Sequence, residues 1–151
     1  MKSTTSFFLI DDDTDDTDLF QSLLSEVAPQ VRFDAAENGL EAIEKLTSAS
    51  IPLPDLIFLD LNMPKMNGKE CLSLLKQNEQ LRHIPVIMYT TSSQSKDIEE
   101  TMLNGAICFI VKPSSLIELR NIIAAIAANV RGDLERTLRQ LSETVSTFIV
   151  C

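Results

Sequence analysis

The sequence has little of what several classes of functional site require. Its 151 residues include one histidine, His83, and three cysteines that lack C-x-x-C spacing. This pattern predicts neither a disulfide framework nor a zinc site. We therefore interpret Cys71 and Cys108 as small apolar core residues and Cys151 as an exposed thiol.

Basic residues are also scarce. Thirteen Lys and Arg stand against 22 Asp and Glu, which gives a formal net charge of −9. This balance argues against binding to nucleic acid or to an anionic membrane surface, since both need clustered basic side chains. The stretch from Met1 to Phe8 has one lysine and a very short apolar run, so we expect neither a signal peptide nor a membrane span. We predict a cytoplasmic protein.

What the chain does contain is a regular alternation of two patterns. A hydrophobic content of 44% over 151 residues predicts one packed domain. Short apolar runs, typical of buried strands, alternate with segments that carry helical periodicity and capping signals. The five expected strands are Phe7 to Ile10, Val31 to Ala35, Leu56 to Leu59, Ile84 to Tyr89 and Ile107 to Val111. The expected helices follow these strands near Asp15, Asn38, Gly68, Ile98 and Ser115.

Five strand–helix repeats predict an α/β fold, doubly wound, with a mainly parallel sheet and helices on both faces. The loop after the first strand is rich in Asp and has no glycine, which argues against a dinucleotide-binding site. After Gly132 an apolar seam recurs at spacings of 4, 3, 4 and 3, formed by Leu134, Leu138, Leu141, Val145 and Phe148. Such a short seam does not establish a coiled coil, so packing on its own domain and self-association as a homodimer both stay open.

The predicted strands end in side chains that can do chemistry. These are Asp11 and Asp12 after the first strand, Asp60 after the third, Thr90 after the fourth and Lys112 after the fifth. In open α/β sheets the carboxyl ends of the strands share the edge where ligands bind, so we expect these side chains to lie together. Three close carboxylates need a proton or a cation, and an all-oxygen ligand set favours Mg²⁺.

Magnesium at such an edge suggests phosphoryl chemistry. A carboxylate such as Asp60 can be the nucleophile and form an aspartyl phosphate. The Lys112 ammonium would then pair with one phosphoryl oxygen, and Thr90 would donate a hydroxyl hydrogen bond to another. Positioning and charge stabilisation of this kind supply most of the catalysis of phosphoryl transfer.

Four sequence motifs, which include the strand-end residues named above, resemble those of the receiver domains of two-component response regulators. The motifs are F-F-L-I-D-D, D-L-I-F-L-D-L-N-M-P-K-M-N-G, P-V-I-M-Y-T-T and C-F-I-V-K-P, in the family's order and at its spacing. The resemblance covers residues 6–128 and leaves 132–151 as a C-terminal helical tail. It implies a flavodoxin-like sheet of five parallel strands in the order 2-1-3-4-5.

The resemblance also implies roles for the clustered polar residues. Asp60 is similar to the family's phosphoacceptor and Lys112 to its phosphate-binding lysine. Mg²⁺ would be held by Asp12, Asp60 and the backbone carbonyl of Asn62, with Asp11 acting through water.

A conformational switch is part of the same resemblance. Thr90 and Phe109 are similar to the family's switch pair, and the peptide bond before Pro113 is expected to be cis. A phosphoryl group brings about −1.5 to −2 charges, so Thr90 would be drawn toward it and Phe109 would turn into the vacated space. Phe109 as an ordinary core residue is the alternative.

We therefore expect a stand-alone receiver, similar to chemotaxis-type and phytochrome-associated single-domain regulators. It would accept a phosphoryl group from a histidine kinase or histidine phosphotransfer protein and signal by binding an unknown downstream protein. The residues after Gly132 are too few for an output domain. We expect no turnover enzyme, only catalysis of its own phosphorylation and dephosphorylation.

Two rival functions remain open. One is a scaffold with the receiver fold that works without phosphorylation. The other is a phosphatase that uses an aspartyl phosphate, which needs a second acid two residues after the nucleophile. This chain has Asn62 at that position, so the phosphatase is disfavoured.

Overall fold

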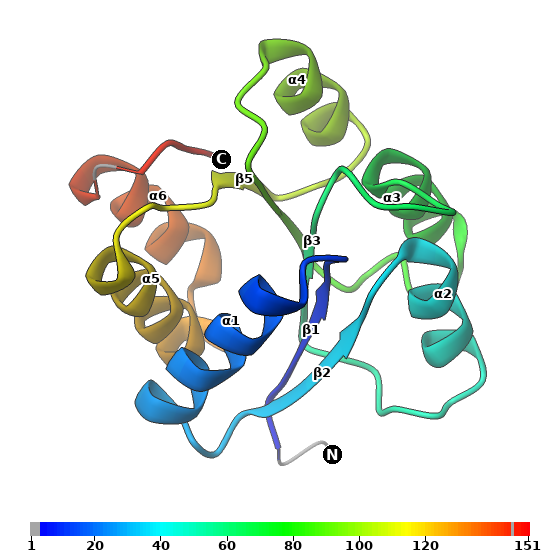
Figure 1. Cartoon of the computed structure of the whole chain (residues 1–151), viewed down its shortest axis with the longest axis horizontal. Helices are drawn as coiled ribbons and strands as arrows, with labels where there is room; N and C mark the ends of the chain where they lie inside the picture. The colour runs from blue at the N-terminus through cyan, green and yellow to red at the C-terminus, as the bar shows by residue number, and fades with distance from the viewer. Residues whose placement is uncertain (1–3, 146) are drawn as a thin grey trace.

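The computed structural model describes residues 4–145 and 147–151 and shows a single sheet between two layers of helices (Figure 1). The strands are β1 (Ser6–Ile10), β2 (Arg32–Ala36), β3 (Leu56–Leu59), β4 (Val86–Thr90), β5 (Cys108–Val111) and β6 (Ile149–Val150). The helices are α1 (Thr14–Val27), α2 (Gly39–Thr47), α3 (Gly68–Gln77), α4 (Ser95–Leu103), α5 (Leu116–Asn129) and α6 (Leu134–Thr144).

The sheet order is β2-β1-β3-β4-β5-β6. The first five strands pair in parallel, so the predicted α/β class and the order 2-1-3-4-5 are confirmed. The prediction of five strands is wrong by one, because β6 adds to the outer edge of β5 in the antiparallel sense. A two-residue strand carries no periodicity that sequence reasoning can detect.

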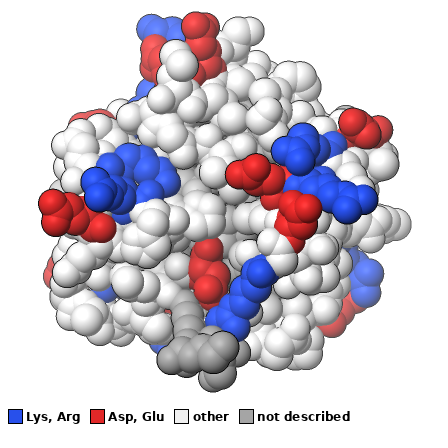
Figure 2. Space-filling model, turned by 180° about the vertical axis from the view of Figure 1, so that it is seen from behind, with Lys and Arg blue, Asp and Glu red and all other residues white. Residues whose placement is uncertain are grey.

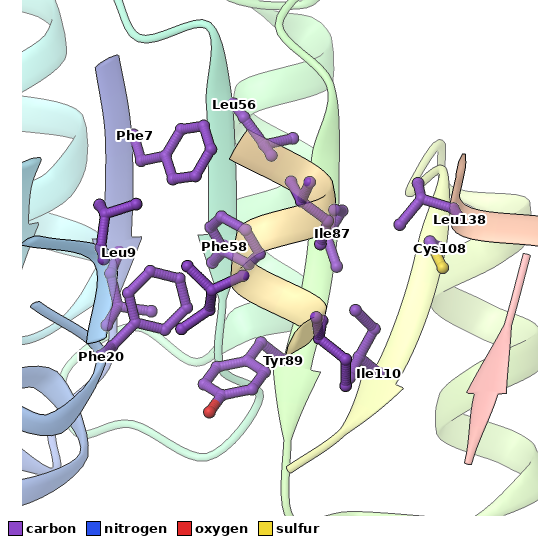
Figure 3. Close-up of a cluster of buried hydrophobic side chains, with 14 of the residues drawn as sticks. Phe7, Leu9, Phe20, Leu56, Phe58, Ile87, Tyr89, Cys108, Ile110 and Leu138 are labelled. Atoms are coloured by element: carbon purple, nitrogen blue, oxygen red, sulfur yellow. The ribbon is translucent and has the colours of Figure 1, made fainter. Parts of the chain in front are cut away.

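Helices α1, α5 and α6 cover one face of the sheet, and α2, α3 and α4 cover the other (Figure 1). On the first face, Phe20 from α1 packs edge-on against Phe58 and Tyr89, with ring centroids 4.9 and 5.7 Å apart (Figure 3). Both faces of β1, β3 and β4 are buried, which explains why these strands are continuous apolar runs in the sequence.

Side-chain caps begin several of the helices where the sequence indicated them. Asn38 accepts a hydrogen bond from the Glu41 amide, and Ser115 accepts one from the Glu118 amide. Asp13 caps α1 through the amides of Asp15 and Asp16. The predicted helix starts at Asn38 and Ser115 are therefore confirmed, because each cap satisfies amides that have no partner inside the helix.

The C-terminal seam packs on its own chain. Leu134, Leu138 and Leu141 of α6 are buried in the same cluster as the inner face of α5. The helix ends at Thr144, and Phe148 is 53% exposed, so the expectation of a helical tail over 132–151 holds only for its first part. The remainder turns back along the sheet because β6 satisfies the backbone groups of the β5 edge.

A disulfide joins Cys108 and Cys151, which are 43 residues apart. The prediction of a free Cys151 thiol is therefore wrong, although the residue is exposed as expected. The cause is the register of β6: Val150 lies opposite Phe109, so the next residues along the antiparallel ladder face each other. Cys71 remains free and buried, and burial raises the pKa of its thiol to about 12.

The surface shown in Figure 2, opposite to the view of Figure 1, carries acidic and basic side chains interspersed with uncharged ones. No broad basic area of the kind that nucleic-acid binding needs is seen on this face. Within residues 4–145 and 147–151, none of the helices is both long and apolar enough to cross a membrane.

Candidate functional site

Strand register brings the chemistry-bearing residues to one edge of the sheet. Ile10 of β1 pairs with Leu59 of β3, so the residues that follow them, Asp11 and Asp60, leave their strands side by side. The Asp60 amide donates to the Ile10 carbonyl at 2.9 Å. On the other side of β3, the Lys112 amide donates to the carbonyl of Thr90 at 2.8 Å. All of these residues lie at the carboxyl ends of parallel strands, where the loops begin.

Three carboxylates gather at this edge. Asp11, Asp12 and Asp60 each offer an oxygen within 4.8 Å of the other two. Asp11 and Asp60 are buried, whereas Asp12 is exposed. Carboxylates at this spacing repel one another, and a nearby positive charge lowers that cost.

Lys112 supplies a positive charge. Its Nζ lies 2.7 Å from Asp11 Oδ2, 2.7 Å from Asp16 Oδ2 and 3.9 Å from Asp60 Oδ2. Burial by itself would lower the pKa of Lys112, but its close contacts with the Asp11 and Asp16 carboxylates outweigh burial and raise the pKa. The ammonium therefore stays protonated at neutral pH. It also lies 5.5 Å from the centre of the Tyr89 ring.

Asp11 is the most enclosed of the acids. Its Oδ1 accepts a hydrogen bond from the Asp13 amide at 2.9 Å, while its Oδ2 is buried and contacts the Lys112 ammonium. Burial raises the pKa of Asp11 to about 6, against the opposing effect of Lys112. Asp11 Oδ2 makes no hydrogen bond of normal geometry within the described residues. A buried oxygen of this kind, beside two further carboxylates, fits a hard divalent cation.

Asp60 is oriented by the loop that follows it. Its Oδ1 accepts a hydrogen bond from the Leu61 amide at 2.8 Å, and its Oδ2 is the oxygen nearer to Lys112. The loop closes where the Gly68 amide donates to the Leu61 carbonyl at 2.7 Å. A Cβ on Gly68 would lie 2.2 Å from the Asp60 carbonyl oxygen, so only glycine permits this approach. Asn62 lies exposed in this loop.

Thr90 and Phe109 lie deeper than the acidic cluster. Both are fully buried, and Thr90 Oγ1 accepts a hydrogen bond from the Ser92 amide at 3.4 Å. Phe109 pairs in register with Met88, so Thr90, two residues beyond Met88, points to the same face of the sheet as Phe109. Phe109 is packed in the core cluster that also contains the inner faces of α3 and α4.

The peptide bond before Pro113 is trans, so the expectation of a cis bond is wrong for this structure. The trans form is the intrinsically preferred state of such bonds by about 0.5–1 kcal/mol.

Asp16 is the residue of this site that sequence reasoning missed. Its only sequence signal is a position in the acidic first turn of α1, where a negative charge complements the helix dipole. Its partner Lys112 is 96 positions away in the sequence, so no local pattern indicates the contact.

The comparisons with known proteins agree with this geometry. A family model for the response regulator receiver domain matches residues 7–124. The chain belongs to this family. It is therefore a receiver domain of two-component signalling, as the motifs indicated.

Two relatives illustrate the similarity. Response regulator Rcp1 from Synechocystis sp. is 32% identical over 122 residues, which cover 78% of this chain and 83% of Rcp1. The crystal structure of the phosphorylated cyanobacterial phytochrome response regulator RcpA superposes with a TM-score of 0.76 at 32% identity, covering 82% of this chain and 91% of that one. The structure of Rcp1 with Mn²⁺ bound gives a TM-score of 0.74 at 30% identity, with 82% and 92% covered.

These relatives support the coarse assignment. Receiver domains bind a divalent metal, and the acidic cluster of this receiver offers the ligands for one. Because the alignment spans most of both chains, the resemblance is to regulators that consist largely of a receiver domain.

Proposed function

We propose that this receiver accepts a phosphoryl group on Asp60 in a Mg²⁺-dependent reaction, and that the modification changes a protein-binding surface. The observation that carries the proposal is the position of the Lys112 ammonium, 3.9 Å from Asp60 Oδ2, beside two further carboxylates at one sheet edge. The proposed donor is a histidine kinase or a histidine phosphotransfer protein.

The transfer requires one bond to form and one to break. A carboxylate oxygen of Asp60 attacks the phosphorus of a phosphohistidine, and the electrons of the P–N bond leave with the imidazole nitrogen, which takes up a proton. The Lys112 ammonium neutralises charge on a phosphoryl oxygen. The Thr90 hydroxyl donates a hydrogen bond to another oxygen. The hydrogen bond from the Leu61 amide fixes the orientation of the attacking carboxylate.

Asp12, Asp60 and the backbone carbonyl of Asn62 would hold the metal, with Asp11 acting through water. When bound, Mg²⁺ offsets the negative charge on the oxygens of the phosphoryl group. The water-mediated role of Asp11 is supported by its membership of the acidic cluster.

The output of the switch would run through α4. If Thr90 moves toward the phosphoryl group, its hydrogen bond with the Ser92 amide changes. The Ser92 hydroxyl donates to Asp97 of α4 at 2.5 Å, so a shift of this loop is transmitted to that helix. A rearrangement of Phe109, which packs beneath α4, would accompany it. The surface formed by α4, β5 and α5 is the proposed site for the downstream protein.

We also propose that the protein acts in the cytoplasm as a stand-alone regulator of the phytochrome-associated type, with residues 6–128 as the receiver and 132–151 as an appendage. The similarity to the phytochrome regulator RcpA supports this narrower assignment.

The test is intact mass after incubation with acetyl phosphate and Mg²⁺, for wild type beside Asp60→Asn. We expect one phosphate adduct on the wild type and none on the variant. An adduct that persists in Asp60→Asn would move the acceptor elsewhere. If neither a small donor nor a histidine kinase produces an adduct on the wild type, the scaffold function replaces this proposal.

A further inference from the structure

Asp16 lies as close to Lys112 as any other carboxylate does. The distance from its Oδ2 to Lys112 Nζ is 2.7 Å, equal to that from Asp11 Oδ2, whereas the acceptor Asp60 is 3.9 Å away. The Lys112 ammonium, which the proposed reaction needs at Asp60, is therefore held closer to two other carboxylates than to Asp60. One belongs to Asp11, which lies beside the acceptor, and the other to Asp16, in the first turn of α1.

The two close carboxylates differ in how easily they release the ammonium. The Asp11 side chain is fully buried and also accepts from the Asp13 amide. The Asp16 side chain is 34% exposed, so water can solvate its carboxylate as soon as the ion pair separates. Separating Lys112 from Asp11 would leave a buried charge without a partner, whereas the partly exposed Asp16 carboxylate can be solvated by water, so Asp16 is the contact that Lys112 gives up at the lower cost.

We propose that Asp16 is a positioning residue that holds Lys112 away from Asp60 in the unmodified receiver and competes with the phosphoryl group for it. The inference rests on the proposed phosphorylation of Asp60. Lys112 must approach the phosphoryl oxygens to neutralise their charge, and it can do so when its contact with Asp16 is exchanged for one with the phosphoryl group. The contact through which Asp16 would act is the one with Lys112.

The Asp16→Asn substitution tests this competition. It keeps the shape of the side chain but removes the charge, so Lys112 is free to move toward Asp60. The affinity for beryllofluoride, a phosphoryl analogue that binds the acceptor carboxylate, should then rise about two- to five-fold in the presence of Mg²⁺, the range that a partly exposed ion pair supports. Isothermal titration calorimetry measures the affinity. The thermal melting temperature without beryllofluoride should stay the same or fall.

Two controls separate this role from others. Asp18→Asn removes the same charge from an exposed position on the same helix and should leave the affinity unchanged. In a Lys112→Met background, Asp16→Asn should have no effect, because the residue through which it acts is gone. An effect that persists there would show that Asp16 acts by general electrostatics and would overturn the proposal.

The remaining outcomes are also decisive. A purely structural role for Asp16 would lower both the melting temperature and the beryllofluoride affinity, and an unchanged or lower affinity in Asp16→Asn overturns the inference while leaving the phosphorylation of Asp60 intact. A wild type that binds no beryllofluoride and gains no phosphate overturns both proposals.

Discussion

Gly68 determines how closely α3 can begin against the loop that carries Asp60. Its amide is hydrogen-bonded to Leu61, and its Cα faces the Asp60 carbonyl oxygen at a distance that leaves no room for a side chain. The sequence indicated Gly68 only as the expected start of a helix, whereas the structure shows that its small size is what allows the loop to close around the acceptor.

We predict that Gly68→Ala destabilises the receiver by about 1–3 kcal/mol, since the added methyl group forces the backbone of the loop to shift. Urea-induced unfolding gives the change in free energy. The matched control is Gly132→Ala, where the nearest atom to a new Cβ is 3.8 Å away, and its stability should stay within error of the wild type. Equal stabilities for all three proteins would show that the loop tolerates the methyl group.

A second prediction at the residue scale concerns Mg²⁺ binding by the acidic cluster. Mg²⁺ that binds the native receiver and not the unfolded chain stabilises it, by about 2.7 kcal/mol at one hundred times the dissociation constant. We expect the melting temperature to rise with Mg²⁺ concentration. Asp12→Asn should remove most of that rise with little effect in metal-free buffer, because the residue is exposed and belongs to the cluster.

Asp18→Asn is the control for the loss of one negative charge, and its melting temperature should respond to Mg²⁺ as the wild type does. If the melting temperature of the wild type is the same with and without saturating Mg²⁺, the result counts against the metal site.

At the scale of the elements, α4 is held to the receiver by few contacts. Its N-cap residue, Gln94, makes no side-chain cap hydrogen bond, and Thr101 is its one buried residue. Lys69 of α3 bridges the helix through Asp97 at 2.8 Å and Glu100 at 2.7 Å. These ion pairs, together with the hydrogen bond from Ser92, position the helix that we propose to transmit the switch.

We predict that Lys69→Met speeds amide hydrogen exchange in α4 by about two- to five-fold while exchange in β1 and β3 stays unchanged, since partly exposed ion pairs contribute about 0.2–1 kcal/mol. Lys96→Met is the control, because Lys96 is 79% exposed and lies 3.8 Å from Glu100. Acceleration throughout the sheet would mean that Lys69 supports the whole fold and not α4 alone.

Strand β6 is a short element at the outer edge of the sheet. It has only two residues, and the disulfide to Cys108 ties its end to the strand that carries Phe109. Phe148 adds one backbone hydrogen bond, from the Val111 amide to its carbonyl at 3.0 Å.

We predict that reduction by a dithiol lowers the free energy of unfolding by about 2–4 kcal/mol, because the 43-residue loop is no longer closed in the unfolded chain. Urea unfolding with and without dithiothreitol measures the loss. The Cys151→Ser variant should already have the lower stability and should not respond to the reductant. A wild type that is equally stable in both buffers would show that the disulfide contributes nothing to the fold.

At the scale of the whole molecule, α6 covers an apolar surface that would otherwise be exposed to solvent. Its residues Leu134, Leu138 and Leu141 cover the outer part of the cluster formed by α1, α5 and the sheet. The seam is thus used within the chain, which argues against self-association through these residues. Removing the helix would expose the surface that it covers.

We predict that deleting residues 134–151 leaves a folded receiver that self-associates, whereas deleting only 147–151 does not change the oligomeric state. Light scattering gives the mass of each protein. The first truncation should have a larger mass, in multiples of its chain, than the full-length protein. Identical oligomeric states in all three would mean that the surface beneath α6 does not drive association.

Sequence and structure agree where a feature depends on neighbouring residues. The apolar runs that became β1, β3 and β4 are buried on both faces, and each ends at a polar residue that leaves the sheet at the same edge. Asn38 and Ser115 cap their helices as expected, because capping depends on residues three positions apart. The gathering of these polar residues at one edge of the sheet was predictable, because parallel strands joined by right-handed crossovers all run in the same direction.

The sequence by itself therefore determined the α/β class and the gathering of Asp11, Asp12, Asp60 and Lys112, and its resemblance to receiver domains implied the order of the first five strands. Only the tertiary structure decided that Asp16 meets Lys112 across 96 residues and that Cys151 meets Cys108 across 43. Neither contact leaves a periodic or spacing signal, because each depends on how two distant elements dock. The same holds for α6, whose apolar spacing fitted either a neighbouring helix or a second chain until its packing on α5 was known.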